Sequence, residues 1–169
     1  ESNQLLWIEP DPTDPPTGPG LFIPAGAKGH VETMGFRVPP PMVSQVTNEL
    51  RLGMVASHMH YLGKDLKITL ERGPLRQPTE TASSCLLQTP YYDFNWQRAY
   101  EYDAPIEQLP ALRPGDVLKI RCTYDNSLDN ELVSSALQQR GLTAPVDVKL
   151  GESTLDEMCL GALVTYQKL

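Results

Sequence analysis

Two of the three histidines in this chain stand two positions apart, as His58 and His60, and this pair is the stretch best suited to chemistry. In an extended strand alternate side chains share a face, so both imidazoles are expected on the same side of the chain. Imidazole binds zinc, copper, iron or nickel, so the pair predicts a metal site without choosing the metal, and a further ligand must come from elsewhere. The alternative is that one histidine is a surface residue and the other is satisfied in the core.

The elements that would position this pair are short strands. From Leu21 onward, short apolar or alternating segments are separated by Gly, Pro and Asn. We predict strands over residues 30–38, 45–59, 65–72, 84–88, 97–102, 117–124 and 158–166, and one helix over residues 130–140. Seven or more short strands at this spacing predict an all-β fold, an antiparallel β-sandwich of the jelly-roll type.

Two of these strands show which side chains point inward. The Pro114-Gly115 turn feeds the strand over 117–124. Period two then predicts one buried face, made of Leu118, Ile120, Cys122 and Tyr124. In the last strand the same period places Met158 and Cys159 on opposite faces.

Residues 1–20 are too rich in Pro and Gly to continue a sheet or a helix. We interpret them as an N-terminal arm or linker, in which residues 5–8 could dock as a short edge strand. Residues 21–169 then form one domain, as the length of 169 residues allows. Because the chain begins with Glu1, we expect a processed product or a piece of a longer protein.

Charge and hydropathy exclude some partners. The net charge is -7 and no run of Lys or Arg is present, which argues against nucleic acid or an anionic membrane surface as the partner. No apolar segment approaches the ~20 residues that a membrane-spanning helix needs.

Three cysteines leave one over if any two pair. Cys122 and Cys159 each lie in a predicted strand, so adjacent strands could join them, although the residues alone leave open whether all three are free thiols. Cys85 would then be a lone thiol, and we expect it to be a small buried side chain.

Three motifs in order resemble the C-terminal copper domain of the copper type II, ascorbate-dependent monooxygenases, the family of the peptidylglycine alpha-hydroxylating and dopamine beta-monooxygenases. The motifs are His58-Met59-His60 with Leu62-Gly63-Lys64, Pro114-Gly115-Asp116 before Cys122, and Asp156-Glu157-Met158-Cys159. The similarity runs from about Leu21 to Tyr166. Two further segments resemble the bacterial branch of the family, namely Cys85-Leu86-Leu87 and Asp93-Phe94-Asn95-Trp96-Gln97.

The resemblance implies that His58, His60 and Met158 bind one copper ion, which alternates between Cu(I) and Cu(II). A thioether is a soft ligand that suits Cu(I), whereas zinc sites use nitrogen, oxygen or thiolate. The resemblance also implies a disulfide between Cys122 and Cys159. With that disulfide, an extracytoplasmic location is expected, whether periplasmic, secreted or cell-surface.

The implied activity is that of an oxidoreductase, a monooxygenase that uses O2 and ascorbate, or another external reductant, to hydroxylate an aliphatic C–H carbon of a small molecule. In this family a second copper, held by histidines of an N-terminal domain, stores and delivers an electron. That N-terminal domain would be the partner of this domain in the full-length protein. Only His30 remains to build such a site here, so the isolated chain is expected to be an incomplete enzyme. The alternative is a non-catalytic copper-binding or recognition module on a jelly-roll scaffold.

The substrate positions depart from the family pattern. Where the peptide-processing member holds a carboxylate, this chain has Ala56, Leu160 and Ala162, none of which can pair with one. This argues against peptidylglycine and favours a more apolar substrate. Three aromatic residues are candidates to line a pocket, or else to pack in the core or at the rim: Tyr91, Tyr92 and Trp96.

Overall fold

The computed structural model describes residues 20–38 and 50–167. The predicted arm, apart from Gly20, and residues 45–49 of one predicted strand lie outside these ranges. The strands are β1 (Phe22–Ile23), β2 (Lys28–Arg37), β3 (Leu50–His58), β4 (Gly63–Glu71), β5 (Ser83–Thr89), β6 (Ala99–Glu101), β7 (Ala111–Leu112), β8 (Val117–Asp125), β9 (Val148–Lys149) and β10 (Leu160–Gln167). The helices are η1 (Ile106–Gln108) and α1 (Glu131–Gln139).

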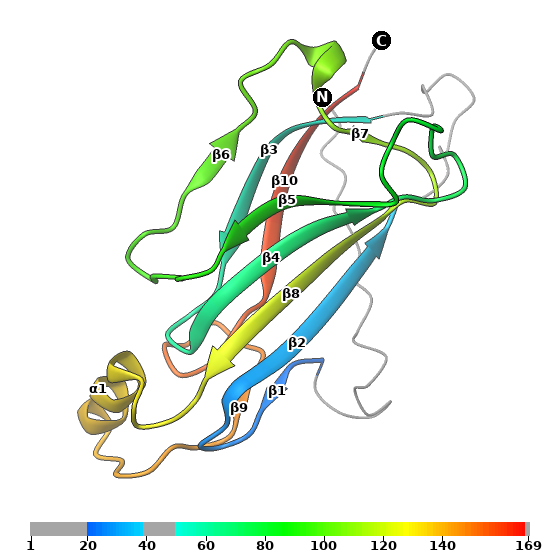
Figure 1. Ribbon diagram of the computed structural model, residues 1–169. Coiled ribbons are helices and arrows are strands. Elements are labelled where there is room, and N and C mark those ends of the chain that lie inside the picture. The colour runs from blue at the N-terminus through cyan, green and yellow to red at the C-terminus, as the bar shows by residue number, and fades with distance from the viewer. Residues whose placement is uncertain (1–19, 39–49, 168–169) are drawn as a thin grey trace.

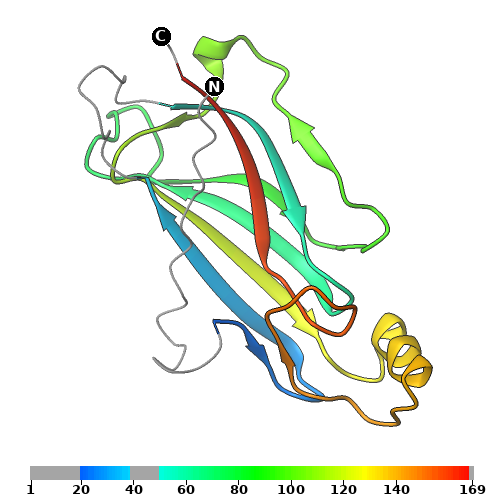
Figure 2. The same cartoon turned by 180° about the vertical axis from the view of Figure 1, so that it is seen from behind.

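The described strands form two main antiparallel sheets, as the all-β sandwich prediction requires (Figure 1). One sheet has the order β2-β8-β4-β5, and the other has the order β10-β3-β6 with β7 also paired to β3. A small third sheet joins β1 to β9. In Figure 2, seen from behind, β10 and β3 lie together in front of the first sheet.

The two main sheets pack closely face to face. A Cβ atom added to Gly161 in β10 would lie 2.8 Å from Cδ1 of Ile68 in β4 and 2.9 Å from Cδ1 of Ile120 in β8. The predicted inward face of β8 is confirmed, since its members are all buried: Leu118, Ile120, Cys122 and Tyr124. Burial of these apolar faces is the main favourable contribution to folding of the sandwich.

A disulfide joins Cys122 in β8 to Cys159, directly before β10, and so links the two sheets. The expectation of a buried Cys85 is wrong, because its side chain is exposed. A bulge in the β4–β5 pairing, between Ile68 and Thr69, breaks the alternation of β5. Leu86 and Leu87 both pack against the core as a result.

The predicted helix is confirmed as α1, which ends at a well-defined cap. Gly141 has a φ of 69°, and its N–H donates to the Gln138 carbonyl while the N–H of Leu142 donates to the Leu137 carbonyl. This pair of bonds is the Schellman arrangement. Val133, Ala136 and Leu137 share one helical face and are buried in the core.

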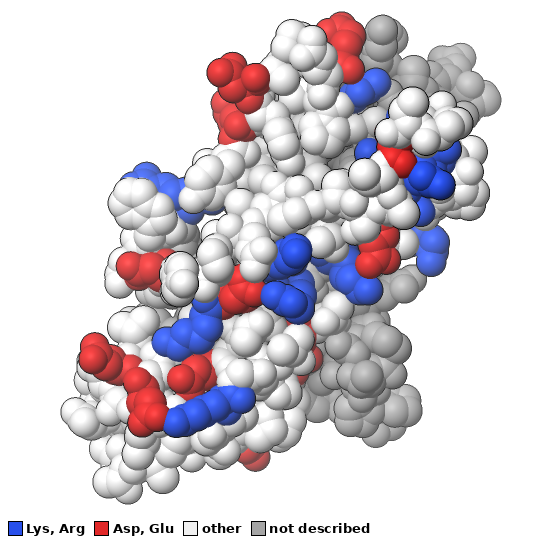
Figure 3. Space-filling view, viewed as in Figure 1, with Lys and Arg blue, Asp and Glu red and all other residues white. Residues whose placement is uncertain are grey.

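Charged side chains of both signs are interspersed on the face drawn in Figure 3. Cross-strand ion pairs account for part of this pattern, among them Lys119 with Glu71 and Arg121 with Asp65. Within the described residues, no helix is long and apolar enough to span a bilayer.

Candidate metal centre

The His58 and His60 rings lie side by side at one end of the sandwich. β3 ends at His58, so His60 lies in the turn to β4 rather than on an extended strand. Met59 between them is fully buried in the core. The ring centroids are 5.1 Å apart with an angle of 86° between the ring planes, close enough for two ring nitrogens to bind one ion.

Both imidazoles are held through Nδ1. The Nδ1 of His60 donates to the Asp156 carbonyl at 2.9 Å. The Nδ1 of His58 lies 2.6 Å from Oε1 of Gln97, whose Nε2 in turn donates to the Phe94 carbonyl at 2.9 Å. Because these acceptors fix the proton on Nδ1, the lone pair of each ring is on Nε2. Neither Nε2 has a hydrogen bond to any residue in the described ranges.

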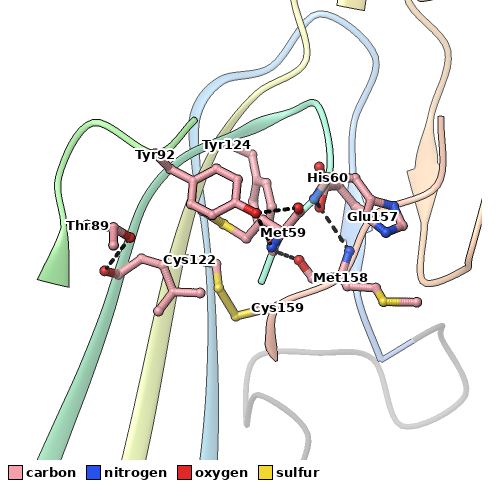
Figure 4. Close-up of a disulfide and its surroundings, with 10 residues drawn as sticks. Met59, His60, Thr89, Tyr92, Cys122, Tyr124, Glu157, Met158 and Cys159 are labelled. Atoms are coloured by element: carbon pink, nitrogen blue, oxygen red, sulfur yellow. Dashed lines mark hydrogen bonds between the residues drawn. A yellow bond between two sulfur atoms is a disulfide. The ribbon is translucent and has the colours of Figure 1, made fainter. Parts of the chain in front are cut away.

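Met158 comes from the other end of the chain. It lies two residues before β10, not within the last strand as predicted. Its N–H donates to Oε2 of Glu157 at 2.9 Å, and its carbonyl accepts from the Tyr124 hydroxyl at 2.9 Å. In Figure 4 the Met158 side chain and the His60 ring extend to the same side, away from the disulfide.

A buried carboxylate joins the two segments. Glu157 is fully buried and accepts three backbone N–H bonds, from His60 and Met158 on Oε2 and from Leu62 on Oε1. Burial raises the pKa of Glu157 to about 7, while the three N–H bonds and the nearby His58 act in the opposite direction.

Tyr92 fixes the turn from the other side. Its hydroxyl accepts from the Met59 N–H at 2.9 Å and donates to the Met59 carbonyl at 2.6 Å. Gly63 leaves room for this packing, since a Cβ there would lie 2.8 Å from Met59 Cβ and 3.0 Å from Tyr92 Cδ1. Burial raises the pKa of Tyr92, and burial raises that of Tyr124 further.

Aromatic side chains from the β5–β6 connection flank the pair. Phe94 packs edge-on against His60 at 6.2 Å and against Tyr61 at 4.7 Å between centroids. Trp96 is 62 % exposed beneath the Arg98 guanidinium, and Tyr91 is 94 % exposed. Of the three aromatic candidates, only Tyr92 is partly buried and hydrogen-bonded to the turn.

The donor set selects among metals. Within residues 20–38 and 50–167, no three His, Cys, Asp or Glu side chains gather closely enough to hold a metal ion. The Met158 thioether, on the side to which the His60 ring extends, is a donor of another type (Figure 4). Two imidazoles and a thioether fit copper better than zinc, magnesium or calcium.

No family model and no curated protein matches this chain. What the site can do therefore follows from its own residues.

The three apolar residues at the positions where the family pattern holds a carboxylate lie on the strand pair that contains the first histidine. Ala162 in β10 pairs with Ala56 in β3, and Leu160 pairs with His58. The remaining histidine, His30 in β2, has its Nε2 2.7 Å from Oε1 of Glu32.

Sequence reasoning missed the residues that support the site: Tyr92, Gln97, Tyr124 and Glu157. Glu157 had a signal, since an acidic residue directly before a proposed ligand is a candidate for fixing that ligand. Gln97 ends a segment that resembles the bacterial branch of the family, but nothing in that segment indicated a contact with His58, which lies 39 positions away along the chain.

Proposed function

We propose that this chain is the copper-binding catalytic domain of a monooxygenase, similar to the copper type II, ascorbate-dependent family and built on a jelly-roll type scaffold. One observation carries the proposal. Both imidazoles are hydrogen-bonded at Nδ1, which leaves both Nε2 atoms for a metal, and the Met158 side chain extends to the same side as the His60 ring (Figure 4).

His58 and His60 would supply their Nε2 atoms and Met158 its thioether sulfur. The thioether favours Cu(I) over harder divalent ions. When bound, copper supplies one-electron chemistry toward O2, which hydroxylation of an aliphatic C–H carbon requires.

The chain's own residues prepare the ligands for this role. Gln97 and the Asp156 carbonyl hold the Nδ1 protons, which fixes the ring orientation and raises the basicity of Nε2. Phe94 covers one edge of the His60 ring, and His60 is only 8 % exposed. The ligands are thus ordered and partly shielded from water before any metal binds.

Hydroxylation consumes O2, two electrons and two protons, and yields the alcohol and water. We propose ascorbate or another external reductant as the source of the electrons, with an N-terminal copper domain of the same full-length protein passing on the second one. His30 is engaged by Glu32, so it gives no support to a second copper site in the described ranges.

The proposed substrate is a small, largely apolar molecule. Ala56, Leu160 and Ala162 form an apolar surface next to His58 and offer no partner for a carboxylate. An extracytoplasmic location is proposed because disulfides such as Cys122–Cys159 persist in oxidising compartments.

The deciding experiment replaces Met158 by Ile, which retains bulk and removes the sulfur. Wild-type protein should bind one Cu(I) and show Cu–S scattering in X-ray absorption. Met158→Ile should lose that scattering and bind Cu(I) more weakly, whereas Met34→Ile, a buried methionine of β2, should retain both. Unchanged Cu–S scattering in Met158→Ile would show that the ligand assignment is wrong.

A second experiment separates the enzyme from a non-catalytic copper module. With copper, ascorbate and O2, the isolated chain should consume O2 slowly and release peroxide without coupled product, because no second copper supplies the second electron. Adding a histidine-rich copper domain should yield hydroxylated product, and His60→Ala should abolish it. No product from any substrate with such a domain present would favour the module.

A further inference from the structure

We propose that Glu157 is the positioning residue of the copper site, because its carboxylate holds His60 and Met158 in register with each other. This inference rests on the proposed function. It adds a residue that contacts no metal and acts through two of the three ligands.

One carboxylate oxygen of Glu157 accepts hydrogen bonds from the backbones of both ligands, His60 and Met158. Oε2 of Glu157 accepts from the His60 N–H at 2.8 Å and from the Met158 N–H at 2.9 Å. Oε1 accepts from the Leu62 N–H at 2.8 Å, which fixes the turn after His60 as well. Two segments 97 residues apart along the chain are thereby joined through a single side chain.

The surroundings argue against a simple ion-pair role. Glu157 is fully buried, and within the described residues no Lys or Arg forms a salt bridge with it. A buried carboxylate is costly unless it is hydrogen-bonded, and here the partners are three backbone N–H groups of the site. An apolar residue of similar size would satisfy none of those groups.

One other bond joins the same two segments, and further contacts hold the Met158 segment in place. The His60 ring meets the Asp156 carbonyl, Tyr124 holds the Met158 carbonyl, and the disulfide fixes Cys159. Among the contacts in the described ranges, only the Glu157 carboxylate bonds the backbones of both ligands. Its loss should therefore loosen the backbones of His60 and Met158 relative to each other, while the bond from the His60 ring to the Asp156 carbonyl remains.

The test compares Glu157→Gln with a matched control. Gln keeps the size, but its NH2 group cannot accept a hydrogen bond, so at least one backbone N–H loses its acceptor. Cu(I) affinity should fall about 10- to 100-fold, the usual range for residues that support metal ligands. The Cu–S scattering should weaken or vanish while both histidine contributions remain.

Asp116→Asn is the control. Asp116 is also buried and accepts two backbone N–H bonds, from Gly73 and Arg113, in addition to pairing with Arg72, but it lies directly before β8 rather than near the histidines. It should lose stability yet keep Cu(I) affinity within about twofold and keep the Cu–S scattering. An equal loss of Cu(I) affinity in both variants would reduce Glu157 to a general stabiliser and overturn the inference.

The outcomes separate this inference from the proposed function. If wild-type protein shows no Cu–S scattering, the proposed function fails. If wild-type protein shows it and Glu157→Gln keeps the same affinity and the same scattering, only the positioning role fails.

A measurement on wild-type protein covers the case in which Glu157→Gln does not fold. In metal-free protein the amides of His60, Leu62 and Met158 should already be protected from hydrogen exchange, and Cu(I) should add little to that protection. Unprotected amides that become protected only when Cu(I) is added would contradict positioning by Glu157.

Discussion

His58 and His60 are each held at Nδ1, and Met158 is held at both of its backbone polar groups. The atoms proposed to bind copper, the two Nε2 atoms and the Met158 sulfur, are therefore not the atoms whose hydrogen bonds hold these residues in place. This division lets a metal bind or leave without breaking the contacts that order the site. It also means that residues outside the ligand set control affinity.

Gln97 is the most direct test of that control. Gln97→Leu removes the acceptor on His58 Nδ1, so the ring can rotate or place its proton on Nε2. We expect Cu(I) affinity to fall about 10- to 100-fold, measured by competition with a chromogenic chelator. Gln88→Leu on β5 is the control, since the Gln88 side chain donates only to Asp65 among the described residues and its loss should leave affinity unchanged. Equal affinities in both variants would refute the role of Gln97.

The buried tyrosines predict how stability depends on pH. Burial raises the pKa of Tyr92 and Tyr124 in the folded protein above the ordinary value of about 10. The folded form then keeps protons that the unfolded chain releases, so this contribution to stability is complete below about pH 10 and is lost as the pH rises above it.

Urea unfolding between about pH 8 and 11 should therefore show falling midpoints above about pH 10. Tyr124→Phe should flatten this dependence, since it removes the more strongly shifted group. Phenolate absorbance of folded wild-type protein that exceeds that of Tyr124→Phe near pH 10 would show that Tyr124 ionises without unfolding.

At the level of elements, the site lies where strand β3 ends and strand β10 begins. His60 follows the end of β3 and Met158 precedes the start of β10, so turn backbone rather than strand pairing sets their positions. Such turns need close packing, and Gly63 is the point of closest approach, under Met59 and Tyr92.

Gly63→Ala should consequently disturb the site. The added Cβ overlaps Met59 and crowds Tyr92, and overpacking of this kind typically costs about 1–3 kcal/mol. Cu(I) affinity should fall as well, because Met59 lies between the two histidines. Gly35→Ala in β2 is the matched control, since its Cβ would meet only Val117 at an ordinary 3.8 Å. Denaturant unfolding and Cu(I) titration of both variants check this, and similar losses in the two would contradict it.

The sequence predicted strands well where the alternating segment was long enough for its period to be recognised. The alternation of β8 from Leu118 to Tyr124 is visible in the letters, and the seven predicted strands correspond to β2, β3, β4, β5, β6, β8 and β10. Strands β1, β7 and β9 have two residues each, too few to show a period, and exist because a distant partner pairs with them. Gln97 and Glu157 were missed as supports for the same reason, since their roles depend on contacts across the fold.

For the molecule as a whole, the Cys122–Cys159 disulfide holds the two sheets together near the site. Replacing both cysteines by Ala should lower the free energy of unfolding by about 3–4 kcal/mol, the amount the chain-entropy model gives for a loop of this length. Cys85→Ala should have little effect, because that thiol is free and exposed. Urea unfolding measures both, and equal stabilities would contradict the prediction.

The distance along the chain between the parts of the site also sets an order of events during synthesis. The histidine turn emerges early, whereas its partner carboxylate at Glu157 follows 97 residues later. Because His58 pairs with Leu160 in β10, the last strand must dock before the histidines acquire their neighbours. Domains generally fold as units, so the site is completed only when both of its segments are available. If copper binds here as proposed, loading should follow the docking of β10 onto β3.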